Sequence, residues 1–128
     1  MLDINPEIVC FLIERARVFH SKEAVVLPEV PDNPTDDWGL QVLADHVDDS
    51  TLQEFKAAVD DLEPDQQQAV VALMWVGRGD FSADEWEAAL AEAEDNWTEH
   101  TAEYLIAHPY LADHLQEGLA EFGYDCAS

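Results

Sequence analysis

Two pairs of histidine and glutamate come closest to the spacing of a chemical site. His100 with Glu103 and His114 with Glu117 are each three positions apart, so each pair places a nitrogen and an oxygen ligand on one face of a helix. Folding back at Pro109 could bring both pairs to one metal ion. The order is the reverse of the Glu-x-x-His pattern of di-iron bundles, and His/Glu neighbours arise readily in an acidic chain. We therefore predict no metal or other cofactor, and a metal site at these residues is the alternative.

Arg78 is the only Lys or Arg in the second half of the chain, and it lies in a corner flanked by glycines. Asp80 follows it, and Trp75 and Trp86 lie on either side in the sequence. The guanidinium could bind an anionic ligand at this corner. We favour an internal Arg–carboxylate clamp that ties helices together, because Arg–carboxylate pairs are frequently bidentate.

Acidic side chains recur along residues 83–107, which we expect to form one long helix that bends near Asn96. They form a predicted negative ridge, which consists of Glu85, Glu92, Asp95, Glu99 and Glu103. Like charges at helical spacing cost a few tenths of a kcal/mol per pair. A basic protein that covers the ridge, or salt that screens it, would relieve this repulsion. The ridge is therefore our predicted partner-binding surface.

The composition indicates one folded domain and excludes two classes of partner. The chain has 128 residues, 48% of them hydrophobic, which suits a single compact domain over residues 1–128. Its 29 Asp and Glu against 5 Lys and Arg give a formal net charge of −24. Such a charge repels phosphate backbones and anionic lipids, so we expect no direct nucleic-acid or membrane binding.

The cysteines and the hydropathy pattern predict a cytoplasmic protein. Cys10 and Cys126 lie far apart in the sequence, and we expect them to form neither a disulfide framework nor a metal site. A reducing cytosol is then the simplest compartment. No signal-peptide pattern is visible, and the longest apolar run, residues 69–76, is too short to span a bilayer.

Capping signals and apolar spacing predict an all-α fold of about six or seven helices around a buried central helix. The central helix is the one that starts at Pro64, because residues 69–76 are apolar on every side. Other helices are expected over residues 6–20, near Trp38, and over residues 50–62, 83–107 and 109–122. Residues 24–37 contain a proline every third position and are predicted to form an ordered strap.

Two segments resemble a known family. Residues 71–81, with the sequence VALMWVGRGDF, and residues 104–119 are similar to a bacterial family called domain of unknown function 3775. The resemblance covers most of the chain. That family has no established activity, so the resemblance assigns no functional residue to this chain.

The function predicted from these patterns is a small acidic helical module that binds a basic protein. A salt-adapted domain of other function and a small metal-dependent helical enzyme are the alternatives. No phosphate-binding loop, dinucleotide fingerprint or nucleophile motif stands out, so we do not favour an enzyme and name no catalytic residue. Trp38 or the strap could also make a homodimer contact.

Overall fold

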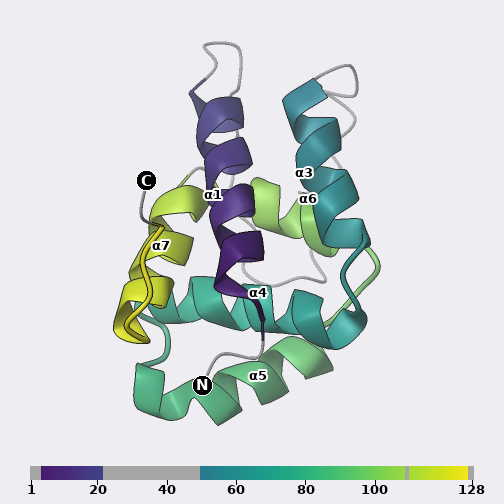
Figure 1. Cartoon of the computed structure of the whole chain (residues 1–128). Coiled ribbons are helices and arrows are strands. Elements are labelled where there is room, and N and C mark those ends of the chain that lie inside the picture. The colour runs from purple at the N-terminus through teal and green to yellow at the C-terminus, as the bar shows by residue number, and fades with distance from the viewer. Residues whose placement is uncertain (1–3, 22–49, 109, 127–128) are drawn as a thin grey trace.

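Six α-helices and one short 3₁₀ turn form the described part of the computed structural model (Figure 1). The structure describes residues 4–21, 50–108 and 110–126. The elements are α1 (Pro6–His20), α3 (Ser50–Asp60), α4 (Pro64–Arg78), η1 (Ala83–Glu85), α5 (Trp86–Asp95), α6 (Thr101–Ile106) and α7 (Leu111–Glu121). The predicted all-α class is confirmed, and these residues contain no strand. The predicted strap over residues 24–37 and the helix near Trp38 lie outside the described residues.

Helix α4 is the central element, as predicted from its apolar sequence. It runs across the middle of the molecule, with α5 on one side and α1 and α3 on the other (Figure 1). Every residue from Ala69 to Val76 is buried. Helix α7 packs closely on α4, because a Cβ at Gly77 would overlap the carbonyl of His114 and a Cβ at Gly118 would meet Leu73. Among the described residues, no helix is long and apolar enough to cross a membrane.

Local hydrogen bonds explain two of the predicted helix starts, at residues 6 and 83. Asn5 Oδ1 accepts from the Glu7 amide at 2.9 Å, and α1 begins at Pro6. A capping box forms after the Arg78 corner, since the Ser82 amide donates to Glu85 Oε1 at 2.8 Å. It starts the 3₁₀ turn η1, which leads directly into α5.

The prediction of one long helix over residues 83–107 is wrong. Helix α5 ends at Asp95, and α6 starts only at Thr101. Asn96 Nδ2 donates to both the carbonyl and the carboxylate of Glu92 at 2.9 Å, and Thr98 Oγ1 accepts from the backbone amide of His100. These side chains offer the backbone local partners that compete with the helix, so the chain turns between the two helices.

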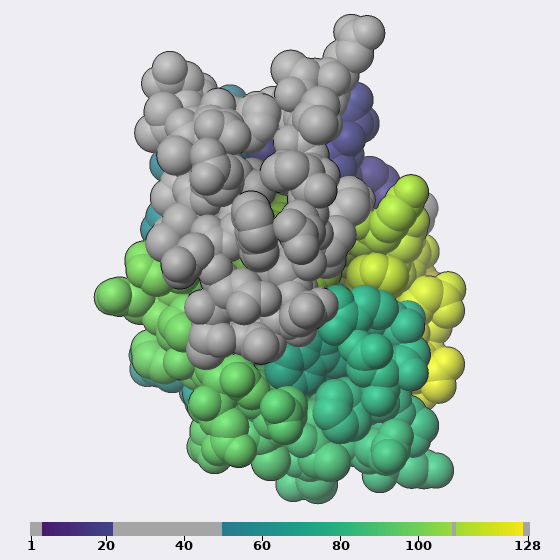
Figure 2. Space-filling model, turned by 180° about the vertical axis from the view of Figure 1, so that it is seen from behind, coloured from purple at the N-terminus to yellow at the C-terminus, as the bar shows by residue number. Residues whose placement is uncertain are grey.

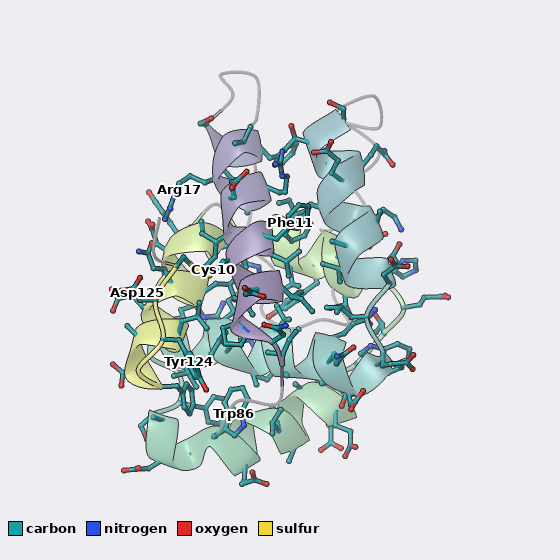
Figure 3. All side chains as sticks on the ribbon, in the orientation of Figure 1. Cys10, Phe11, Arg17, Trp86, Tyr124 and Asp125 are labelled. Carbon is teal, nitrogen blue, oxygen red and sulfur yellow. A yellow bond between two sulfur atoms is a disulfide. The ribbon has the colours of Figure 1, made fainter. Side chains whose placement is uncertain are left out.

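A disulfide joins Cys10 and Cys126, so the prediction of unpaired cysteines is wrong. Helix α1 packs on α7, and Gly123 (φ 81°) turns the C-terminal segment back along α1. The two Cα atoms lie 5.5 Å apart although the residues are separated by 116 positions. Figure 3 shows Cys10 beside the returning segment with Tyr124 and Asp125. Sequence separation gives no information about this distance, because domain termini often lie close together. Unpaired cysteines were the reason to expect a reducing compartment, so the disulfide removes that reason.

Candidate functional site

A pocket of about 470 Å³ opens beside α3 and the start of α6. Three carboxylates, one ammonium group, one imidazole and one indole contribute to its wall. The polar and aromatic lining residues are Lys56, Asp60, Gln67, Trp97, Glu99, His100 and Glu103. The three carboxylates outnumber the one ammonium group, so the pocket is acidic.

Glu103 is the buried carboxylate of this pocket, with only 4% of its surface exposed. Its Oε1 accepts no hydrogen bond from the described residues. Its Oε2 lies 3.9 Å from Lys56 Nζ and 3.5 Å from His100 Nδ1. The Lys56 ammonium is held by a hydrogen bond to Asp60, and this bond raises the pKa of Lys56. Glu103 is thus a buried acid with unused hydrogen-bonding capacity, which is costly in an apolar interior.

Trp97 forms an anchored aromatic wall of the same pocket. Its Nε1 donates to Gln67 Oε1 at 2.7 Å. Gln67 is itself buried and donates to the Val59 carbonyl at 2.9 Å and to the Leu62 carbonyl at 3.3 Å. Because this chain of bonds fixes the indole, 37% of Trp97 stays exposed in a defined orientation.

The predicted negative ridge does not run along one continuous helix. Glu85 belongs to η1, and Glu92 and Asp95 belong to α5, where both are exposed. Glu99 lies in the turn after α5, and Glu103 is buried on α6. The ridge required a continuous helix, and the break at Asn96–His100 separates its two ends. Glu92 and Asp95 lie on α5, whereas Glu99 and Glu103 line the pocket.

A second hollow, of about 410 Å³, lies between the N-terminal half of α4 and α5. Asp65 from α4 and Glu87 and Glu94 from α5 contribute carboxylates, and Leu90 and Ala91 contribute apolar surface. No Lys or Arg of the described chain forms an ion pair with a carboxylate of α5. We call the exposed side of α5 together with this hollow the α5 face. In Figure 2, which views the molecule from behind, the α4 and α5 regions form the lower part of the surface, in teal and green.

The Arg78 corner contains the predicted contact with Asp80, at 2.7 Å from Nε to Oδ2. This pair joins two residues of one corner rather than two helices. The aromatic residues make the links between elements instead. Trp75 Nε1 donates to the hydroxyl of Tyr104 at 3.0 Å and so ties α4 to α6, while Trp86 packs edge-on against Phe122 at the end of α7.

The two His/Glu pairs do not meet at a metal site. His100 and Glu103 approach each other as predicted, but beside Lys56 on α3. His114 lies on α7, where burial and the nearby Arg78 lower its pKa, and Glu117 is exposed. Within the described ranges, no three His, Cys, Asp or Glu side chains are arranged to hold a metal ion. The alternative of a shared site at Pro109 is therefore wrong for these four residues.

His108 is a buried histidine near the Arg78 corner. His108 is 1% exposed, and its Nδ1 lies 2.9 Å from the Tyr104 carbonyl. Burial lowers the pKa of His108 to about 4 and raises the pKa of Tyr104. His108 Nε2 has no partner among the described residues. This cluster lines none of the hollows described above, so we regard it as part of the core.

A family profile described as protein of unknown function (DUF3775) matches residues 52–124, which is more than half of the chain. The chain belongs to the DUF3775 family. The match extends from α3 through α7 and so includes both the pocket and the α5 face. Both cysteines of the disulfide lie outside it. No curated protein and no solved structure matches the chain.

Several residues of this DUF3775 pocket were not identified from the sequence. Lys56 and Asp60 are four apart on α3 and could have been recognised as a helical ion pair. Trp97 and Gln67 belong to the same pocket wall. No sequence signal reveals that they meet, because their contact joins residues 30 positions apart.

Proposed function

We propose that this DUF3775 domain is a protein–protein interaction module that binds a basic partner on the α5 face. The observation that carries the proposal is the uncompensated charge of α5. Its exposed carboxylates are Glu87, Glu92, Glu94 and Asp95. None of them pairs with a Lys or Arg of the described residues, and a partner that supplied those cations would relieve their mutual repulsion.

The Lys and Arg side chains of the described residues form ion pairs with carboxylates outside α5. Arg15 pairs with Glu14 and Glu54, Arg17 with Asp113, Lys56 with Asp60, and Arg78 with Asp80. Residues 79–126 contain thirteen Asp and Glu but no Lys or Arg. The charge is therefore uneven, and the α5 face presents a negative field that would steer a basic partner toward it.

The hollow between α4 and α5 adds shape to this charge. Leu90 and Ala91 provide an apolar strip, and Asp65, Glu87 and Glu94 provide acidic side chains around it. An amphipathic basic helix carries the complementary pattern, with apolar anchors on one side and Lys or Arg at their edges. We therefore propose an amphipathic basic segment as the bound element of the partner.

The test uses a synthetic amphipathic peptide rich in Lys and Arg, labelled for fluorescence anisotropy. We expect saturable binding that weakens steeply as salt rises. The double variant Glu87→Gln/Glu94→Gln should weaken binding by about 5- to 30-fold, if each of the two lost charge pairs contributes about 0.5–1 kcal/mol.

The matched control is Glu117→Gln/Glu121→Gln, which removes the same charge from exposed positions on α7. We expect this control to reduce affinity far less than the α5 variant. Equal losses in both variants would indicate only diffuse attraction to an acidic protein and would refute the α5 face. A domain that binds no peptide at low salt, but whose melting temperature rises strongly with salt, would support the salt-adapted alternative instead.

The cytoplasmic location remains a proposal. It depended on unpaired cysteines, and disulfides are rare in reducing compartments. Counting free thiols on protein isolated under alkylating conditions tests it. Two free thiols in the isolated protein would support a reducing compartment, and none would oppose it.

A further inference from the structure

We propose that the pocket around Glu103 binds a guanidinium group. This group belongs either to an arginine of the basic partner or to a free small guanidine. The first source rests on the proposed function, and the second does not.

The unused carboxylate oxygen of Glu103 is the main argument for a ligand. Glu103 is 4% exposed, and its Oε1 accepts nothing from the described residues. Lys56 and His100 lie near the other oxygen without completing the carboxylate's hydrogen bonds. Because leaving a buried acceptor unpaired is costly, a donor that enters the pocket would gain more here than at the surface.

The remaining walls select a cation that is flat. Asp60 and Glu99 add negative charge, while the Lys56 ammonium is already bonded to Asp60. Trp97 presents an indole that Gln67 holds in place, and a guanidinium can stack on such a ring. A guanidinium also donates two parallel hydrogen bonds to one carboxylate, which an ammonium group cannot do. The two features together favour guanidinium over a lysine-like amine.

The first experiment is a titration followed by NMR of the Trp97 indole N–H, assigned with Trp97→Phe. N-ethylguanidinium is the probe, and N-ethylurea is its neutral counterpart of the same shape. We expect saturable shifts of the Trp97 signal with N-ethylguanidinium and none with N-ethylurea. Equal shifts with both, or no saturable shift with either, would overturn the inference.

The second experiment compares two single carboxylate variants. Glu103→Gln should weaken N-ethylguanidinium binding by about 10-fold or more, because a charged hydrogen bond is lost. Glu117→Gln removes one exposed charge on α7 and should leave the affinity for N-ethylguanidinium unchanged. Unchanged binding in Glu103→Gln would overturn the inference. Should that variant not fold, Trp97→Leu replaces it, with the His100 amide as reporter. An affinity about two- to five-fold lower is then expected, and an unchanged one would overturn the inference.

The source of the guanidinium is decided with an arginine peptide and the same peptide carrying citrulline, its neutral analogue. Weaker binding of the arginine peptide to Glu103→Gln than to the wild type supports an arginine of the partner. Equal binding to both proteins overturns the role of Glu103 but leaves the proposed function intact. Binding of N-ethylguanidinium without binding of the peptide supports a free small guanidine and refutes the proposed function.

Discussion

Opening the Cys10–Cys126 disulfide should lower the stability of this domain substantially. The bond links positions 116 apart, so it closes a loop that includes nearly the whole described chain. In the chain-entropy treatment, closing a loop of that length lowers the entropy of the unfolded state and so raises its free energy by about 5 kcal/mol at 25 °C. The C-terminal segment next to the bond is partly exposed: 38% of Tyr124 is accessible, although its amide donates to the Leu119 carbonyl.

Urea denaturation with and without a phosphine reductant measures this contribution. We expect the free energy of unfolding to fall by about 5 kcal/mol on reduction, and the double variant Cys10→Ser/Cys126→Ser to behave like the reduced protein. Reductant should not affect that double variant. The amide of Tyr124 should also exchange faster once the bond is open. A loss below about 1 kcal/mol would refute the reasoning, because the chain-entropy treatment gives a much larger effect for a loop of this length.

Three further changes test the core. Burial lowers the pKa of His108 from 6.5 to about 4, so the neutral imidazole stabilises the fold fully above pH 6.5, and this stabilisation is lost as the pH falls toward 4. In urea titrations over this pH range, the free energy of unfolding of His108→Gln should vary by about 3 kcal/mol less than that of the wild type. Gly118→Ala should destabilise by about 1–3 kcal/mol in thermal melts, because its methyl group meets Leu73, and no loss would contradict the close packing. Tyr104→Phe should cost about 1–3 kcal/mol by leaving the indole N–H of Trp75 unpaired, and a neutral result would show that another acceptor replaces the hydroxyl.

Features set by neighbouring residues could be predicted from the sequence. The cap at Asn5, the capping box at Ser82 and the buried stripe of α4 each depend on residues within a few positions, and each is present. Gly118 lies inside α7, where a Cβ would meet Leu73, and a glycine inside a helix indicates such a close contact because it is otherwise unfavourable there.

Features set by tertiary contacts could not be predicted. The apolar spacing continues from Trp86 past Trp97, so periodicity alone favours a continuous helix, whereas the side chain of Asn96 ends α5. The same spacing places Glu103 on an exposed ridge, and the packing of α6 on α3 buries it beside Lys56. The carboxylates were therefore recognised from the sequence, but their division between the α5 face and the pocket was not.

The most direct test of the α5 face is the association rate of the basic peptide, measured by stopped flow over a range of salt concentrations. The wild type should associate rapidly at low salt and much more slowly at high salt, because long-range attraction guides the encounter. The charge-reversed variant Glu87→Lys/Glu94→Lys should lose most of this salt dependence, and Glu117→Lys/Glu121→Lys should keep most of it. A salt dependence that is absent in the wild type, or reduced equally by both variants, would contradict a basic partner at the α5 face.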